Sequence, residues 1–193
     1  MLTQLSTIKA RLGIDDFDVS HDALLANFIE AASATFEKYC NRQFGREVDF
    51  AQEFPADNSE IILVKYPVES VTKFQLKQNE TDGWVDQAAP DYLIRSACVV
   101  SLEEPLGSCR ELARILYTGG YVLPGATPGT GQQALPADLE QAAVEQVAAW
   151  YQNRDKLGLV RYWPKGGIYL EFVQSDMLIS VRAVLERYKR ISL

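Results

Sequence analysis

The first dozen residues place apolar side chains at helical spacing. Leu2, Leu5, Ile8 and Leu12 recur at three- and four-residue intervals and are followed by Gly13. Glycine readily adopts the left-handed conformation that ends many helices. The pattern predicts a short amphipathic helix with Gly13 as its C-terminal cap.

A longer apolar stripe runs from about Ser20 to Asn41 and predicts a second helix. Ser20 is a candidate N-cap, and Asp22 suits the positive end of the helix dipole. His21, the chain's one histidine, is interpreted as an exposed first-turn residue. The stripe consists of Leu24, Leu25, Phe28, Ile29, Ala32, Phe36, Tyr39 and Cys40. A continuous stripe of this kind must face another element.

From Phe44 to Tyr117 the chain changes to short runs of β-branched and aromatic residues separated by Pro, Asn, Asp and Gly. This sequence pattern is typical of an antiparallel sheet. Residues 79–83 predict a hairpin turn, and Trp84 after it is expected to cap a sheet edge. The predicted strands are Glu47–Phe54, Ile61–Lys65, Val71–Lys77, Tyr92–Ile94, Cys98–Leu102 and Leu112–Tyr117.

Residues 118–135 contain five glycines and two prolines without periodicity, which predicts a flexible loop. Glycine-rich loops sometimes hold phosphate, but this one lacks the Lys-Ser/Thr pair of a P-loop and the dinucleotide fingerprint. We therefore expect the loop to fit a partner protein.

Two further helices are predicted after the loop. The first runs from Pro136, at the N1 position, to Asn153, and the last from Asp176 to Arg190, with Ser175 or Asp176 at its start. A brief strand is expected at Ile168–Val173 between them. The basic end of the last helix complements its dipole, which explains those charges more simply than nucleic-acid binding does.

Composition narrows the possible functions. The chain has 193 residues, is 47% hydrophobic and carries a formal charge of -7. Nonspecific binding to nucleic acid needs clustered Lys and Arg, so this charge argues against it. The three cysteines, Cys40, Cys98 and Cys109, lie far apart in apolar or strand-like segments of the sequence. They are expected to be reduced structural thiols, which fits a cytoplasmic protein. Neither a signal peptide nor a membrane helix is indicated.

Candidate chemistry is scarce. Two pairs of acids, at residues 15–16 and 103–104, are candidates for the metal site of a hydrolase, but neither pair has a partner at metal-loop spacing. Adjacent strand residues also point to opposite faces. We expect no catalytic, cofactor-binding or metal-binding residues.

The order of these segments and several phrases in them resemble the bacteriophage head-tail connector proteins, also called neck or adaptor proteins, in their longer form with a β insertion. The phrases are Asp15-Asp16 through Ile29-Glu30-Ala31-Ala32, Glu37-Lys38-Tyr39-Cys40-Asn41-Arg42-Gln43-Phe44, Leu63-Val64-Lys65-Tyr66-Pro67-Val68-Glu69-Ser70-Val71, Leu116-Tyr117-Thr118-Gly119-Gly120-Tyr121, Leu135-Pro136-Ala137-Asp138-Leu139, Trp150-Tyr151-Gln152-Asn153-Arg154-Asp155 and Val184-Leu185-Glu186-Arg187-Tyr188. The long segment Lys156–Gln174 departs from the family pattern.

The resemblance implies an α+β fold in which the N- and C-terminal helices form a bundle with an inserted antiparallel β lobe. The whole chain, 1–193, would be one connector domain. Its parts would be a helical core of residues 1–43 and 136–193, a β lobe of residues 44–117, and the flexible loop 118–135.

The resemblance also implies a structural protein without enzymatic activity. It would form a ring of about a dozen copies joined head to tail, contacting the portal protein and a tail or tail-completion protein while DNA passes through without sequence-specific binding. Its place would be the virion neck, after assembly in the host bacterial cytoplasm. Among residue types common at interfaces, we expect Trp150, Tyr151, Arg154 and Tyr188 to contact other subunits or partners.

Two alternatives of other classes stay open. One is an adaptor outside any virus that binds a peptide along a sheet edge. The other is the metal-dependent hydrolase considered above.

Overall fold

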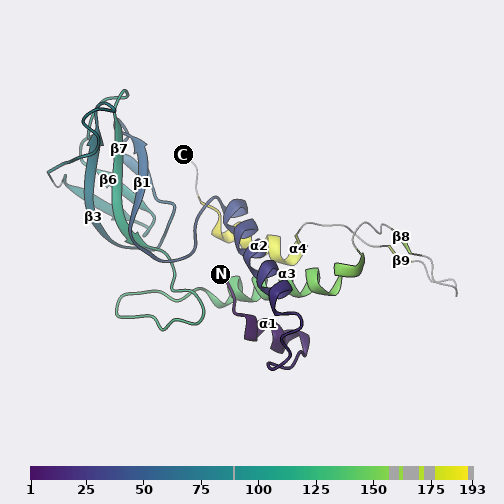
Figure 1. The fold of residues 1–193 in the computed structure, drawn as a ribbon. Coiled ribbons are helices and arrows are strands. Elements are labelled where there is room, and N and C mark those ends of the chain that lie inside the picture. Colours follow the sequence, from purple (N-terminus) through teal and green to yellow (C-terminus); the bar gives the residue numbers. More distant parts are fainter. Residues whose placement is uncertain (89, 157–160, 163–169, 172–176, 191–193) are drawn as a thin grey trace. The chain divides into compact units, whose positions relative to one another are not determined.

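The computed structural model describes residues 1–88, 90–156, 161–162, 170–171 and 177–190. Helices and antiparallel sheets are both present, so the predicted α+β class is confirmed. The chain divides into two compact units (Figure 1). The helical unit combines Met1–Cys40 with Pro136–Tyr188, and the β unit contains Asn41–Leu135 together with Lys189 and Arg190.

The helical unit is organised around a central helix, α3. The helices are α1 (Leu5–Leu12), α2 (Asp22–Cys40), α3 (Ala137–Gln152) and α4 (Ile179–Leu185), with 3₁₀ turns at Arg154–Lys156 and Glu186–Tyr188. Helix α3 contacts each of the other three, and Figure 1 shows it between α1 and α4. One buried cluster consists of Ile8, Leu25, Ile29, Ala32, Val144 and Val147. The apolar stripes predicted from the sequence therefore face one another.

The ends of α2 and α3 lie within two residues of the predicted ones. Gly13 has φ +70° and its N–H donates to Ala10 O, as a C-cap does, so that prediction is confirmed. The N-cap prediction for Ser20 is wrong, because α2 begins at Asp22 and the Ser20 hydroxyl donates to Asp18 Oδ1 at 2.6 Å. Pro136 occupies the N-cap of α3 instead of N1, so the helix begins one residue later than predicted, at Ala137.

The β unit contains two antiparallel sheets. The first has the order β1-β7-β3-β4 and the second the order β2-β6-β5. Their bounds are β1 (Glu47–Pro55), β2 (Glu60–Ile62), β3 (Val68–Lys77), β4 (Val85–Asp86), β5 (Tyr92–Arg95), β6 (Val99–Leu102) and β7 (Leu112–Gly119). Alternate residues of β6 and β7 are buried. Side chains from both sheets, such as Phe54, Ile61, Phe74, Val100 and Ile115, form one core.

All six strands predicted between Phe44 and Tyr117 are present, with small changes at their ends. Strand β2 ends at Ile62 instead of Lys65, and β3 begins at Val68 instead of Val71. Strand β4 was not predicted, since its two residues are too few to show alternation. The hairpin turn is confirmed, with Asn79 Oδ1 accepting hydrogen bonds from Thr81 N and Asp82 N.

Both ends of the predicted loop 118–135 are joined to regular structure. Thr118 and Gly119 belong to β7, and isolated bridges pair Tyr121 with Gly45 and Val122 with Ala134. The irregular stretch is therefore shorter than predicted.

Parts of the C-terminal third lie outside the described residues. These include residues 157–160, most of the strand predicted at Ile168–Val173, and the predicted start of the last helix at Ser175 or Asp176. Leu170–Glu171 (β9) pairs with Arg161–Tyr162 (β8). The last helix predicted up to Arg190 is α helical only as Ile179–Leu185 and then tightens into a 3₁₀ turn.

Candidate functional site

The C-terminal end of α3 carries an aromatic cluster. The ring of Trp150 meets Phe28 of α2 edge to face, with 6.1 Å between centroids. Tyr151 meets His21 in the same manner at 5.5 Å. All four side chains are half-buried. The prediction that His21 is exposed is therefore wrong, because Tyr151 covers one side of its ring.

Arg154 folds back on this cluster. Its Cζ lies 4.2 Å from the Tyr151 ring centroid, and Nη1 donates to Tyr151 O at 2.7 Å. Nη2 is 3.9 Å from Asp155 Oδ2. Trp150, Tyr151 and Arg154 thus form one patch in which each side chain already has contacts within the chain, and only part of each remains accessible to another molecule.

Tyr188 lies away from this patch. Its hydroxyl donates to Asp138 Oδ1 at 2.5 Å, in the first turn of α3. Asp138 and Trp150 are twelve residues apart on one helix, which corresponds to about 18 Å along its axis. The structure therefore brings together three of the four predicted interface residues and places Tyr188 at the opposite end of α3.

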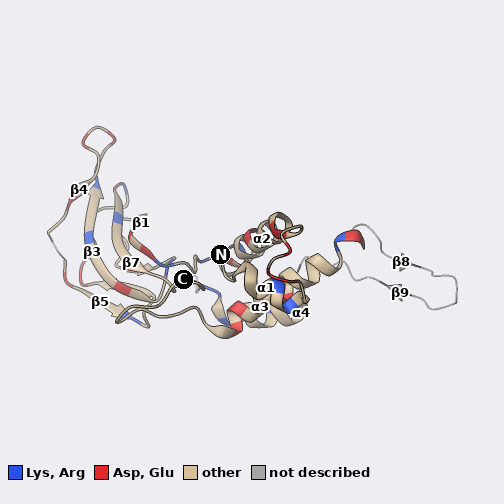
Figure 2. Ribbon diagram, turned by 60° about the horizontal axis from the view of Figure 1, so that its bottom comes forward, with Lys and Arg blue, Asp and Glu red and all other residues tan. Residues whose placement is uncertain are grey.

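The loop between α1 and α2 exposes apolar side chains that periodicity did not identify. Phe17 is 93% exposed and Val19 71% exposed. Acidic residues lie along the same loop and are shown in red in Figure 2. The signal in the sequence was an apolar residue between acids, outside both helical stripes.

Hydrogen bonds hold this loop in one shape. Asp15 Oδ1 accepts from Phe17 N at 2.9 Å, and Asp18 Oδ1 accepts from Ser20 N at 3.0 Å. The hydrogen bonds from the Ser20 hydroxyl and backbone lower the pKa of Asp18 below its usual value. Lys9 Nζ donates to Asp16 O at 3.1 Å. The exposed ring of Phe17 is therefore presented on an ordered turn.

Helix α4 also exposes a large apolar side chain. Ile179 is 83% exposed, and Arg182 and Ala183 lie three and four residues later on the same face, also exposed. Val181 and Leu185 point into the core instead.

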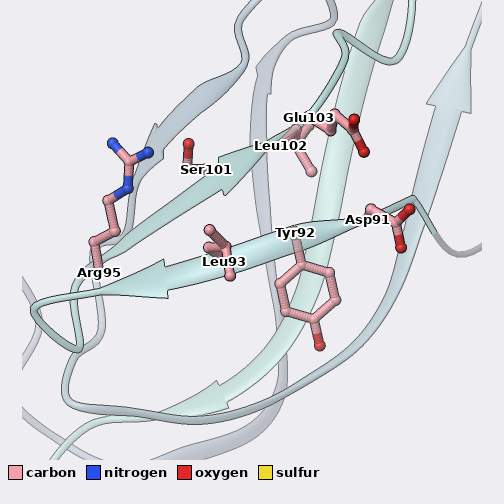
Figure 3. Close-up of a pocket in the computed structure, with 7 residues that line it drawn as sticks. All are labelled: Asp91, Tyr92, Leu93, Arg95, Ser101, Leu102 and Glu103. Atoms are coloured by element: carbon pink, nitrogen blue, oxygen red, sulfur yellow. The ribbon is translucent and has the colours of Figure 1, made fainter.

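The β unit has a pocket of about 430 Å³ over β5 and β6 (Figure 3). Tyr92, Leu93 and Ile94 of β5 are all exposed, and Tyr92 meets Phe74 edge to face at 5.7 Å. Arg95 lies at one end of the pocket and Asp91 and Glu103 at the other. Because the pocket is open and mostly apolar, it suits contact with protein better than catalysis.

Strand β5 is an edge of its sheet. Residues 91 and 103 form a hydrogen-bonded pair, with Glu103 N donating to Asp91 O at 3.1 Å. In an antiparallel ladder the intervening residue turns its N–H and C=O away from the partner strand. The backbone groups of Tyr92 and Ile94 therefore point outward from β6.

The acids considered for a hydrolase do not converge. Asp15 and Asp16 belong to the ordered turn, and Glu103 lines the β5–β6 pocket. Within the described ranges, no three His, Cys, Asp or Glu side chains are placed to hold a metal ion. In the same ranges, no helix has both the length and the apolar character to cross a bilayer.

Three of the quoted family phrases meet at a single side chain in the β unit. Arg42 is 3% exposed, and its Cζ lies 3.3 Å from the ring centroid of Tyr66, 4.8 Å from that of Phe44 and 5.4 Å from that of Tyr121. The guanidinium also donates to Tyr66 O. Burial raises the pKa of Tyr66. The three segments therefore meet in one cation–aromatic cluster around the buried guanidinium of Arg42.

Residues 2–80 match the family model described as phage gp6-like head-tail connector protein. The resemblance to head-tail connectors is confirmed. The connector match extends from α1 through β3 and includes Arg42, Phe44 and Tyr66. The quoted phrases after residue 80 lie beyond it. No protein in a search of curated sequences matches the chain significantly.

The fold is shared with chains from solved particles of a gene transfer agent. A chain from the neck of an empty particle, computed with C6 symmetry, is 18% identical with a TM-score of 0.63. A chain from the native virion is 19% identical at 0.58, and one from the native neck, computed with C12 symmetry, is 18% identical at 0.57. Each alignment covers 97% of this chain, and 89%, 89% and 88% of the other chain. The similarity therefore includes both units.

Proposed function

We propose that this chain is a structural neck protein that forms a homo-oligomeric ring at the portal vertex, joins capsid to tail and lets DNA pass. The observation that carries the proposal is the connector match over residues 2–80 together with a fold shared along 97% of the chain with particle neck chains. The symmetry used for the neck particles, C6 and C12, supports a ring of identical subunits.

In this proposal the whole chain acts as one connector domain. Residues 1–43 and 136–193 form the helical bundle that builds the ring, residues 44–117 form the β lobe, and the loop 118–135 adapts to a partner. The partners are further copies of the chain, the portal protein and a tail or tail-completion protein. The protein assembles in the bacterial cytoplasm and ends in the virion neck, and it has no enzymatic activity.

The charge of the chain supports passage of DNA. A formal charge of -7 repels phosphate, so the duplex would slide without being held. The proposed contacts between subunits use the accessible parts of Trp150, Tyr151 and Arg154. Tyr188 would contribute at a separate place, because it lies at the other end of α3.

The test uses full-length protein mixed with purified portal protein and viewed by negative-stain electron microscopy. Rings bound to portal are expected. Trp150→Ala should keep the helical circular dichroism signal yet reduce incorporation into particles. Trp84→Ala, a change at a half-buried tryptophan of the β unit, is the matched control. The absence of rings with wild-type protein would contradict the proposed function.

One observation favours a second candidate function, peptide binding at the β5 edge. The outward backbone groups of Tyr92 and Ile94 beside exposed apolar side chains are what strand addition requires. Ile94→Pro removes an outward N–H, which an edge strand tolerates. If an extended segment binds here, this variant should stay folded and lose that binding, whereas Ile94→Val should retain it.

A further inference from the structure

Phe17 and Ile179 are the two most exposed large apolar side chains among the described residues, at 93% and 83%. Both belong to the helical unit. Phe17 follows α1 and Ile179 begins α4, and α3 packs between those two helices (Figure 1). One subunit therefore exposes two separate large apolar side chains on different sides of its central helix.

The surroundings of the two side chains have opposite charge. Phe17 lies among the carboxylates of Asp15, Asp16 and Asp18. Ile179 shares its helix face with Arg182, which is exposed. Arg187 follows at the end of the same segment, 67% exposed, with its Nη1 3.8 Å from Asp138 Oδ2 of its own chain. Glu186, also in this segment, accepts a hydrogen bond from Tyr39 of its own chain. The acidic loop that carries Phe17 and the arginine beside Ile179, Arg182, are complementary in charge.

We propose that the Phe17 loop of one copy docks on the outer face of α4 in the next copy. Phe17 packs against Ile179 and Ala183, and Asp16 pairs with Arg182. This inference rests on the proposed ring and adds a second contact to the one proposed for Trp150, Tyr151 and Arg154. Since the Phe17 loop and its receiving face are different surfaces of one subunit, the contact is heterologous and propagates head to tail, as closure by rotation requires.

The loop is suited to this role because it is already ordered. The hydrogen bonds from Phe17 N and Ser20 N to aspartate side chains, and the bond from Lys9 Nζ to Asp16 O, fix its shape before any contact forms. Binding then costs little additional loop entropy, and aromatic side chains, Phe included, are enriched at protein interfaces.

The test is a charge exchange in the full-length protein. Asp16→Lys and Arg182→Glu should each weaken subunit association at least tenfold, measured by sedimentation velocity with and without portal protein. The double variant should restore association to within about threefold of wild type. Asp16 is chosen because Asp15 and Asp18 supply the side-chain oxygens that shape the loop.

A second measurement tests proximity directly. In a Cys109→Ser background, which removes the exposed thiol, Phe17→Cys with Ile179→Cys should give disulfide-linked multimers. Val48→Cys with Ile179→Cys is the control, because Val48 is an exposed apolar residue of the β unit. The cross-link should be absent from the control.

The outcomes separate this contact from the ring itself. Restored association in the double variant, with the specific cross-link, supports the contact. Normal rings in both single variants, or weakened association that the double variant does not restore, would overturn the contact while leaving the ring. Wild-type protein that never forms rings with portal would overturn both.

Discussion

Lys9 of α1 and Asp22 of α2 form an ion pair with 2.6 Å between Nζ and Oδ1, and the Lys9 side chain is only 4% exposed. Because the same ammonium also donates to Asp16 O, one buried lysine joins two helices and the loop between them. The helices and the turn that displays Phe17 are thus stabilised together.

Lys9→Met should lower the free energy of unfolding by about 2 kcal/mol, less than the loss of a fully buried pair, because Asp22 is 29% exposed and regains water. Urea denaturation followed by circular dichroism measures it. Lys38→Met, at an exposed position of α2, is the control and should change stability by less than about 0.5 kcal/mol. Equal effects of the two variants would contradict a structural role for the pair.

Two phenylalanines of α2 should respond differently to truncation. Phe36 is fully buried, so Phe36→Ala should cost about 3 to 5 kcal/mol. Phe28 is half-buried against Trp150, so Phe28→Ala should cost only about 1 to 2 kcal/mol. Thermal unfolding of both variants in the same buffer provides the comparison. A larger loss for Phe28→Ala would mean that this ring has further contacts in the folded protein.

The buried phenol of Tyr117 should make the folded protein less stable in strong alkali. Its burial raises the pKa of the phenol to about 12, whereas an unfolded tyrosine titrates near 10. The folded state therefore holds a proton that the unfolded state releases. Stability from this group is fully present below about pH 10 and decreases as pH rises toward 12, by at most about 1.4 kcal/mol per pH unit.

Tyr117→Phe tests this interpretation. The hydroxyl accepts from Lys65 N at 2.9 Å and donates to Gln52 Oε1 at 3.1 Å, so its removal should cost about 1 to 3 kcal/mol at neutral pH. The variant should also lose less stability than wild type between pH 10 and 11, measured by urea unfolding at each pH. Parallel pH profiles for the two proteins would show that this phenol is not responsible.

Gly120 is expected to tolerate no side chain. It has φ +105°, and an added Cβ would lie 2.7 Å from Gly45 O and 2.9 Å from Arg46 Cα. Gly120→Ala should therefore cost more than about 3 kcal/mol, combining backbone strain with a backbone clash. Gly13→Ala has the same kind of positive φ, at +70°, but open space around it, and should cost about 1 kcal/mol. Similar melting temperatures for the two variants would contradict this.

Local features were predictable from the sequence because their causes are local. The Gly13 cap, the turn at Asn79 and the six strands follow from residue types in short windows. Exceptions arose where a neighbouring residue competed, as Asp18 does by accepting the Ser20 hydroxyl. The two-residue β4 was too short for any pattern.

Features that depend on tertiary contacts were not predictable. The rings of Tyr66 and Tyr121 both contact the guanidinium of Arg42, although the three residues are widely separated in sequence. Apolar periodicity finds the buried face of a helix, so it could not identify Phe17 and Ile179, which are exposed. Residue type alone grouped Tyr188 with Trp150, but the path of the chain places them at opposite ends of α3.

The order of the units along the chain has a consequence for biosynthesis. The β unit is nearly continuous in sequence, whereas α2 reaches α3 only after residues 41–135 have been made. Domains generally fold as units during synthesis, so the sheets can form while the N-terminal helices still await their neighbours. Chains that terminate before Met177 lack the buried residues of the last helix, Val181 and Leu185. Truncated translation products of this kind therefore lack apolar contacts that the core of the helical unit needs.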